Sequence, residues 1–170
     1  MLLSSVVHAD PRIWVLIDTE HDRAEVLRGD DPLALFSNIS WGRGGVAPIH
    51  TAGDATTPLG RYHITRIEHD SRFHVFIELN YPTLIHLDRA FRQGIVDLGT
   101  YQDLLDYALA HGRLPPATEL GGHIGIHGVG KGDPAVHARF HWTKGCVALT
   151  DSQVDQLLEY VQVGTPVVIR

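Results

Sequence analysis

The sequence predicts a mainly β fold with some α, namely a β-sandwich or open barrel with two main helices. Its 170 residues have the size of one ordinary domain. Short apolar runs that alternate like strands recur along the chain, whereas only two longer segments repeat apolar residues at helical spacing. Because the sequence shows neither repeats nor a dividing linker, we expect one domain over residues 1–170, with residues 1–11 as a tail or signal remnant.

The predicted strands begin in the first half of the chain. Residues 13–17 form an apolar, β-prone run, and residues 24–28 are its expected hairpin partner. Residues 33–41 give a third strand, and residues 60–67 and 73–79 give two more. In the last of these, strand alternation predicts one face with Phe73, Val75, Ile77 and Leu79 and the opposite face with His74, Phe76 and Glu78.

Two helices are predicted in the second half. Residues 100–111 carry leucine and alanine at helical spacing, with Thr100 as the expected N-cap and Gly112 as the stop. A capping-box pattern over residues 150–153 opens the second helix, which we expect to end at Gly164. A short final strand follows at the end of the chain.

Composition excludes several classes of function. The net charge is −6 and the sequence has no cluster of Lys and Arg, so we expect no nucleic-acid partner. A helix across a bilayer needs about 20 apolar residues in a row, and no such run occurs, so no membrane span is expected. The single cysteine rules out an internal disulfide, while 12 histidines direct attention to proton transfer or metal binding.

The most informative segment for chemistry surrounds that cysteine. Two strand-like pieces, residues 123–127 and 145–149, flank a polar loop. A thiolate is the nucleophilic form of cysteine, and a histidine nearby would take the proton and favour it. The backbone N–H groups of Gly145 and Cys146 would receive the oxyanion formed by attack on a carbonyl, at about 3 kcal/mol per donor. Thr143 and Lys144 would shape the turn.

The residues alone leave two other interpretations open. Cys146 has apolar neighbours, and a lone cysteine in such a setting is most often a packed core residue. His123 with His127, and His137 with His141, are spaced by four, as zinc ligands on a helix would be. Glycines make the first pair a poor helix, so we predict no metal and no cofactor.

A resemblance to a known family favours the catalytic interpretation. His127-Gly128, followed across a loop by Thr143-Lys144-Gly145-Cys146-Val147, resembles the active-site signature of the YkuD-type L,D-transpeptidases. Upstream, Thr57-Pro58-Leu59-Gly60-Arg61-Tyr62 is similar to a further segment of this family. Asn80-Tyr81-Pro82 resembles an element of its YafK-like murein branch, and Gly164-Thr165-Pro166-Val167 resembles its closing strand. The likeness covers residues 12–170.

The resemblance implies a role for four residues. Cys146 matches the nucleophile, and His127 matches the general base. The carbonyl of Gly128 would hold the histidine ring in the useful tautomer. Gly145 and Cys146 match the backbone of the oxyanion hole.

The implied reaction is acyl transfer on peptidoglycan stem peptides. The thiolate would attack the amide between meso-diaminopimelate, or a similar residue, and D-alanine. An amine acceptor would resolve the thioester by transfer, whereas water would make the protein an L,D-carboxypeptidase or amidase. The other alternative is a non-catalytic wall-binding or scaffold domain in which Cys146 is only packed. The implied location is the periplasm or cell envelope, although no intact signal peptide is recognised in this chain; the oligomeric state is left open.

Two positions depart from the family pattern. Lys144 stands where many members have histidine, and Ala148 stands where many have an arginine that would anchor a substrate carboxylate. Arg139 is a candidate replacement for that anchor. The expected substrate contacts are Tyr62, His123, Arg139, Thr143 and Lys144.

Overall fold

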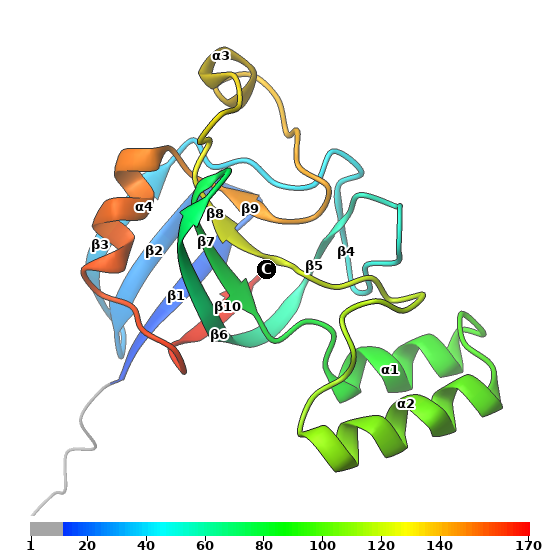
Figure 1. Cartoon of the computed structure of the whole chain (residues 1–170). Helices are drawn as coiled ribbons and strands as arrows, with labels where there is room; N and C mark the ends of the chain where they lie inside the picture. The colour runs from blue at the N-terminus through cyan, green and yellow to red at the C-terminus, as the bar shows by residue number, and fades with distance from the viewer. Residues whose placement is uncertain (1–11) are drawn as a thin grey trace, which may run out of the picture.

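The structure, a computed structural model, describes residues 12–170 (Figure 1). The expected tail over residues 1–11 lies outside the described residues. The strands are β1 (Ile13–Asp18), β2 (Arg23–Arg28), β3 (Asp31–Ser37), β4 (Val46–Ala47), β5 (Thr57–Pro58), β6 (Gly60–Ser71), β7 (His74–Leu79), β8 (Gly125–His127), β9 (Val147–Ala148) and β10 (Pro166–Ile169). The helices are α1 (Leu84–Arg92), α2 (Leu98–His111), α3 (Pro134–His137) and α4 (Asp151–Leu158).

Eight of these strands form one mixed sheet in the order β3-β2-β1-β10-β6-β7-β8-β9. The pairs β1–β10 and β8–β9 are parallel, and the other neighbours are antiparallel. The last strand of the chain thus lies between the β1–β3 meander and the β6–β7 hairpin (Figure 1). The prediction of a mainly β fold with a few helices is confirmed.

Alternate residues of the strands build the main core, together with one face of α4. The fully buried members include Val15, Ile17, Ile64, Ile77, Ile126 and Val147. Val154 and Leu157 of α4 join the same cluster. Since each fully buried side chain of this size contributes roughly 1.5–3 kcal/mol, this cluster fixes the register of the strands that carry the functional site.

The third and the fifth predicted strands need correction. The third ends at Ser37 rather than at residue 41, because Asn38 has a φ of 59° and interrupts the extended backbone. In β7, Val75 and its alternates face the core as predicted, but Phe73 does not. His74 has a φ of 71°, which breaks the alternation and turns Phe73 onto the opposite face.

The first predicted helix exists as α2, with an earlier start. Its N-cap is Asp97 and not Thr100, because the Asp97 carboxylate accepts the Thr100 N–H at 2.8 Å. Gly112 ends the helix as predicted, in the left-handed conformation with a φ of 71°. No helix within residues 12–170 is long and apolar enough to cross a membrane.

The second predicted helix, α4, is shorter than expected. It begins after the capping box at Thr150, as predicted, but it ends at Leu158 rather than Gly164. The Gly164 N–H donates to the carbonyl of Ile64 at 2.8 Å, so Gly164 already belongs to the segment that joins the sheet as β10.

Helix α1 was not predicted from the sequence. It packs against α2 as a helical hairpin beside the sheet (Figure 1), over a second small core with Leu87, Ala90 and Leu104. Leu84 and Ile85 are 49% and 69% exposed, while the polar His86 is buried. The buried face of this helix therefore includes a polar residue, while two large apolar residues at its start are exposed.

Candidate active site

The histidine of the predicted signature is the last residue of β8, and the cysteine directly precedes the neighbouring strand β9 at the edge of the sheet. In the parallel β8–β9 pair, Ile126 is opposite Val147 and His127 is opposite Ala148. Ile126 and Val147 point into the core, so strand alternation places His127 and Cys146 together on the other face. The two residues are diagonal neighbours across this pair, a separation that a histidine ring can span.

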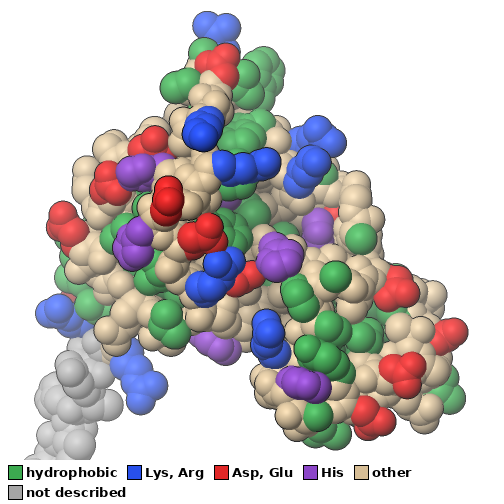
Figure 2. All heavy atoms as spheres, in the orientation of Figure 1, with side chains coloured by type: hydrophobic (Ala, Val, Ile, Leu, Met, Phe, Trp, Pro, Cys, Tyr) green, Lys and Arg blue, Asp and Glu red, His purple; other side chains and the backbone are tan. Residues whose placement is uncertain are grey.

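Cys146 borders a cavity of about 430 Å³ on this face. The cavity is lined by Glu68, Ser71, Arg72, Phe73, Phe76, His123 and Cys146. Figure 2 shows acidic, basic and histidine side chains next to hydrophobic ones over β6, β7 and β8. The thiol donates to the carbonyl of His123 at 3.4 Å. The sulfur is therefore reached from a groove rather than sealed in the core.

The Cys146 thiol is protonated at neutral pH. Burial raises its pKa to about 11, and the negative Glu78 acts in the same direction. The backbone N–H of Gly125 opposes this by stabilising the thiolate. The resulting pKa shift is opposite to the one expected from the sequence, because loss of hydration outweighs that stabilisation in the free protein.

His127 is a buried, neutral imidazole with a fixed tautomer. Its side chain is almost inaccessible, and Nδ1 donates to the Gly128 carbonyl at 2.6 Å, which leaves Nε2 as the acceptor. Burial lowers its pKa to about 4, although the bond to Gly128 acts the other way. The ring of Phe73 stacks on it at 4.3 Å between centroids, and Trp142 meets it edge-on at 5.7 Å.

The sulfur and the ring are not hydrogen-bonded to each other. Among residues 12–170, the partner of the Cys146 thiol is the His123 carbonyl, and no bond to the His127 ring is present. A proton can therefore pass from Cys146 to His127 only after the thiol turns away from that carbonyl.

The turn before Cys146 is held by Thr143. Its hydroxyl donates to the Cys146 carbonyl at 2.6 Å and accepts the Gly145 N–H at 3.2 Å. This is the turn-shaping role expected of Thr143. The Gly145 N–H is thus already occupied, whereas the Cys146 N–H has no acceptor within residues 12–170. Of the two predicted oxyanion donors, the Cys146 N–H is the one available.

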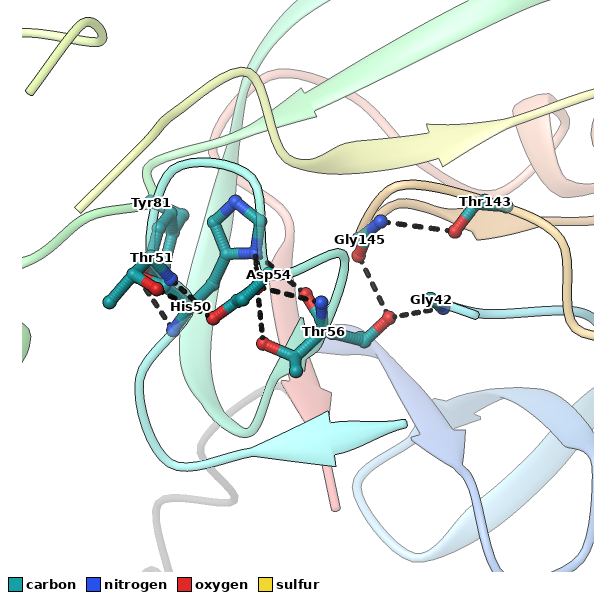
Figure 3. A network of polar contacts seen from close by, with 9 residues as sticks. Gly42, His50, Thr51, Asp54, Thr56, Tyr81, Thr143 and Gly145 are labelled. Atoms are coloured by element: carbon teal, nitrogen blue, oxygen red, sulfur yellow. Dashed lines mark hydrogen bonds and ion pairs between the residues drawn. The ribbon is translucent and has the colours of Figure 1, made fainter. Parts of the chain in front are cut away.

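A second threonine ties this turn to the segment before β6. The Thr57 hydroxyl donates to the Gly145 carbonyl at 2.9 Å and accepts the Gly42 N–H at 2.8 Å (Figure 3). Gly145 has a φ of 131°, and a Cβ there would lie 2.8 Å from the Thr56 carbonyl oxygen. The position therefore requires glycine.

His50 and Asp54 stabilise the same segment through hydrogen bonds. The sequence analysis did not predict this role. Asp54 accepts hydrogen bonds from the backbone and hydroxyl of both Thr51 and Thr56, at 2.7–2.9 Å (Figure 3). Burial raises the pKa of Asp54, but these bonds outweigh it and lower the pKa overall. His50 Nδ1 lies 2.8 Å from the Thr56 carbonyl and 2.9 Å from Asp54. Nothing in the sequence indicates that residues 50–56 pack against the Cys146 turn, so this role could not be predicted.

The predicted substrate contacts are distributed over several places. His123 lines the Cys146 cavity. Lys144 lines a different cavity of about 340 Å³ beside His50, and Arg139 lines one of about 140 Å³ near α3. Tyr62 is buried, and its hydroxyl donates to the Pro58 carbonyl at 3.1 Å. Tyr62, Lys144 and Arg139 are thus not brought to the sulfur.

Arg72 lines the Cys146 cavity instead, and the sequence analysis did not single it out. Its guanidinium stacks over the Phe73 ring at 4.5 Å. Within residues 12–170 it forms no salt bridge. β6 extends to Ser71, beyond its predicted end at residue 67. The position of Arg72 in the turn after this strand therefore could not be predicted.

No group of three or more His, Cys, Asp or Glu side chains within residues 12–170 converges in a way that could hold a metal ion. The His123–His127 pair is divided between an exposed ring beside Glu78 and a buried ring beside Gly128. The two histidines therefore do not share a ligand set.

Comparison with known proteins places the chain in a family. Residues 12–169 match the YkuD domain, described as the L,D-transpeptidase catalytic domain. The chain belongs to the YkuD family. This YkuD domain carries its histidine at the end of β8 and its cysteine directly before β9, as described above. Its finer assignment to the YafK-like branch stays a prediction. No curated protein matches the chain.

Solved structures share the fold of this YkuD domain. Bd1075 of Bdellovibrio bacteriovorus is 16% identical with a TM-score of 0.60, over 97% of this chain and 50% of that one. The helical cell shape determining protein Pgp2 of Campylobacter jejuni is 18% identical with a TM-score of 0.59, over 95% and 48%. The L,D-transpeptidase of Enterococcus faecium, as a C442S mutant, is 12% identical with a TM-score of 0.52, over 94% and 50%. The chain spans about half the length of these proteins.

Proposed function

We propose that this YkuD domain is a cysteine-dependent L,D-transpeptidase, which transfers an acyl group from a peptidoglycan stem peptide to an amine. The YkuD family acts on such peptides. The observation that carries the proposal is the placement of Cys146 at a groove, on the same sheet face as His127 with its tautomer fixed. Since the substrate lies outside the cytoplasm, we propose the cell envelope as the location.

Acylation begins from a neutral thiol and a neutral imidazole. As sulfur attacks the carbonyl carbon of the donor amide, the thiol proton passes to Nε2 of His127. The carbonyl oxygen becomes an oxyanion and accepts the free N–H of Cys146. The C–N bond then breaks, His127 returns the proton to the departing D-alanine amine, and the acyl group remains on sulfur as a thioester.

The raised thiol pKa fits this order of events. A free thiolate would need hydration that the partly buried sulfur lacks, so the proton leaves together with the attack rather than before it. Stacking of Phe73 keeps water off the His127 ring, which holds it as an unprotonated base at neutral pH.

The test is a reaction with a purified tetrapeptide muropeptide, followed by mass spectrometry of products and of the intact protein. The wild type is expected to release D-alanine and to carry a transient acyl adduct on Cys146. Cys146→Ala should show neither, while its thermal unfolding stays close to that of the wild type. Turnover retained in Cys146→Ala would reject the nucleophile. Addition of an amine acceptor separates transfer from hydrolysis, because only transfer gives a cross-linked product.

A further inference from the structure

The groove at Cys146 is lined by a histidine that the acylation step does not use. The side chain of His123 is 64% exposed and lines the cavity, and its Nδ1 lies 2.9 Å from Oε1 of Glu78. In contrast, His127 is buried beneath Phe73. His127 is therefore enclosed against the sheet, whereas His123 faces the open side of the groove.

Glu78 holds the His123 ring in one tautomer. Burial raises the pKa of Glu78, but hydrogen bonds from Arg66 and His123 outweigh it and lower the pKa, so Glu78 is ionised at neutral pH. An ionised carboxylate only accepts hydrogen bonds, so Nδ1 of His123 must carry the hydrogen. In the neutral ring the lone pair then lies on Nε2, where it can accept a proton.

Glu78 is itself fixed in place. Arg66 lies opposite it in the β6–β7 pair, and its Nε donates to Glu78 at 3.0 Å. The same guanidinium donates to Glu68 at 2.6 Å. Hydrogen bonds thus connect Glu68, Arg66, Glu78 and the His123 ring in one chain.

The backbone of His123 also touches the sulfur. Its carbonyl accepts the Cys146 thiol at 3.4 Å, so the residue cannot move away from the nucleophile without breaking that contact. A solvent-borne acceptor that approaches a thioester on Cys146 enters through the exposed side of the cavity, where the His123 ring lies.

We propose that His123, oriented by Glu78, is the general base that activates the acceptor in the second half of the reaction. This rests on the proposed function, because it requires a thioester on Cys146. The acceptor nitrogen, or a water oxygen, bonds to the thioester carbonyl carbon while its proton passes to Nε2 of His123. The C–S bond breaks, the new amide or acid leaves, and the sulfur departs as a thiolate that takes the proton from His123. Glu78 is a positioning residue.

The experiment separates the two half-reactions in His123→Gln. Enzyme and tetrapeptide donor are mixed rapidly, and D-alanine release and intact mass are followed in time. We expect the variant to release about one equivalent of D-alanine in a burst and then to turn over about 100-fold more slowly than the wild type. The acyl adduct should accumulate on nearly all of the protein. His69→Gln, the same substitution at an exposed histidine outside the cavity, should behave like the wild type.

Glu78→Gln tests the positioning role. The amide keeps the size of the side chain but loses the charge that fixes the tautomer, so acyl-enzyme should accumulate to a smaller extent than in His123→Gln. A purely structural role would lower the unfolding temperature without changing the acylated fraction. An unchanged acylated fraction in Glu78→Gln would contradict the positioning role.

The outcomes distinguish this proposal from the proposed function. Wild-type turnover without accumulation in His123→Gln overturns the role of His123 and leaves Cys146 as the nucleophile. A variant that fails to acylate, beside a wild type that does, assigns His123 to the first step and overturns the proposal as well. If the wild type itself forms no acyl adduct, the proposed function fails, and this inference fails with it.

Discussion

At the scale of single residues, the reactivity of Cys146 is governed by hydration. The raised pKa of the thiol, about 11, means that the thiolate fraction increases about tenfold per pH unit over the whole neutral range. Labelling by iodoacetamide, followed by intact mass, should therefore be slow at pH 7 and still rising at pH 10. A small free thiol serves as the control, since its rate levels off once the pH passes its pKa of roughly 8.5. A plateau near pH 7 for Cys146 would contradict the pKa shift.

Arg72 gives a second prediction at this scale. Its guanidinium forms no salt bridge within residues 12–170 and lines the Cys146 cavity, so it is suited to a carboxylate of the donor peptide. A charged hydrogen bond contributes about 1.5–3 kcal/mol, so Arg72→Ala should raise KM for the donor about tenfold or more and change kcat little. Arg139→Ala is the comparison, because Arg139 lines a separate cavity. Equal effects of the two substitutions on KM would argue against Arg72 as the anchor.

At the scale of elements, the Cys146 turn depends on Thr57 in β5. Replacing Thr57 by Val leaves the buried Gly42 N–H and the Gly145 carbonyl without their partner. Each unsatisfied buried group costs roughly 1–3 kcal/mol. Thr57→Val should therefore lower the free energy of unfolding by about 2 kcal/mol or more and slow acylation, as measured by urea denaturation and adduct formation.

Thr57→Ser is the matched control for that prediction. It keeps the hydroxyl and removes only a methyl group, so acylation should stay near the wild-type rate. If Thr57→Ser and Thr57→Val slow acylation equally, packing of the methyl group rather than the hydrogen bonds positions the turn.

Local patterns predicted the elements whose ends are set by local chemistry. The capping box at Thr150 and the glycine stop at residue 112 both appear in the structure as expected. Phe73 could not be placed, because one residue with positive φ, His74, reverses the alternation and leaves no trace in the apolar pattern. Helix α1 was missed because its buried face includes a polar residue, His86.

At the scale of the whole molecule, the sheet order decides what meets at the groove. Arg72, His123 and Cys146 come from three distant segments, and only the adjacency of β7, β8 and β9 brings them together. Two short motifs that resemble the active-site signature of the family identified Cys146 and His127, because the spacing of these motifs can be read directly in the sequence. Nothing in the sequence specified the β6–β7 register that pairs Arg66 with Glu78, so the Glu78–His123 contact could not be predicted.

Burial of neutral histidines also gives the whole molecule a pH-dependent stability. The pKa of His127 and that of His86 are both lowered to about 4, chiefly by burial. Between that value and the unfolded pKa of roughly 6.5, the unfolded chain binds more protons than the folded one, so stability falls as the pH falls. The lowered carboxylate pKa values, such as that of Asp18, act mainly below this window.

We therefore expect the free energy of unfolding to drop by roughly 2–3 kcal/mol for each of these histidines between pH 7.5 and pH 4.5. Urea denaturation at the two pH values measures the drop. His127→Gln cannot be protonated, so its drop should be smaller than that of the wild type by about the share of one histidine, even if the variant is less stable at both pH values. An equal drop in the two proteins would mean that His127 gains a proton without unfolding, and therefore that its ring is less isolated from water than the stacked Phe73 implies.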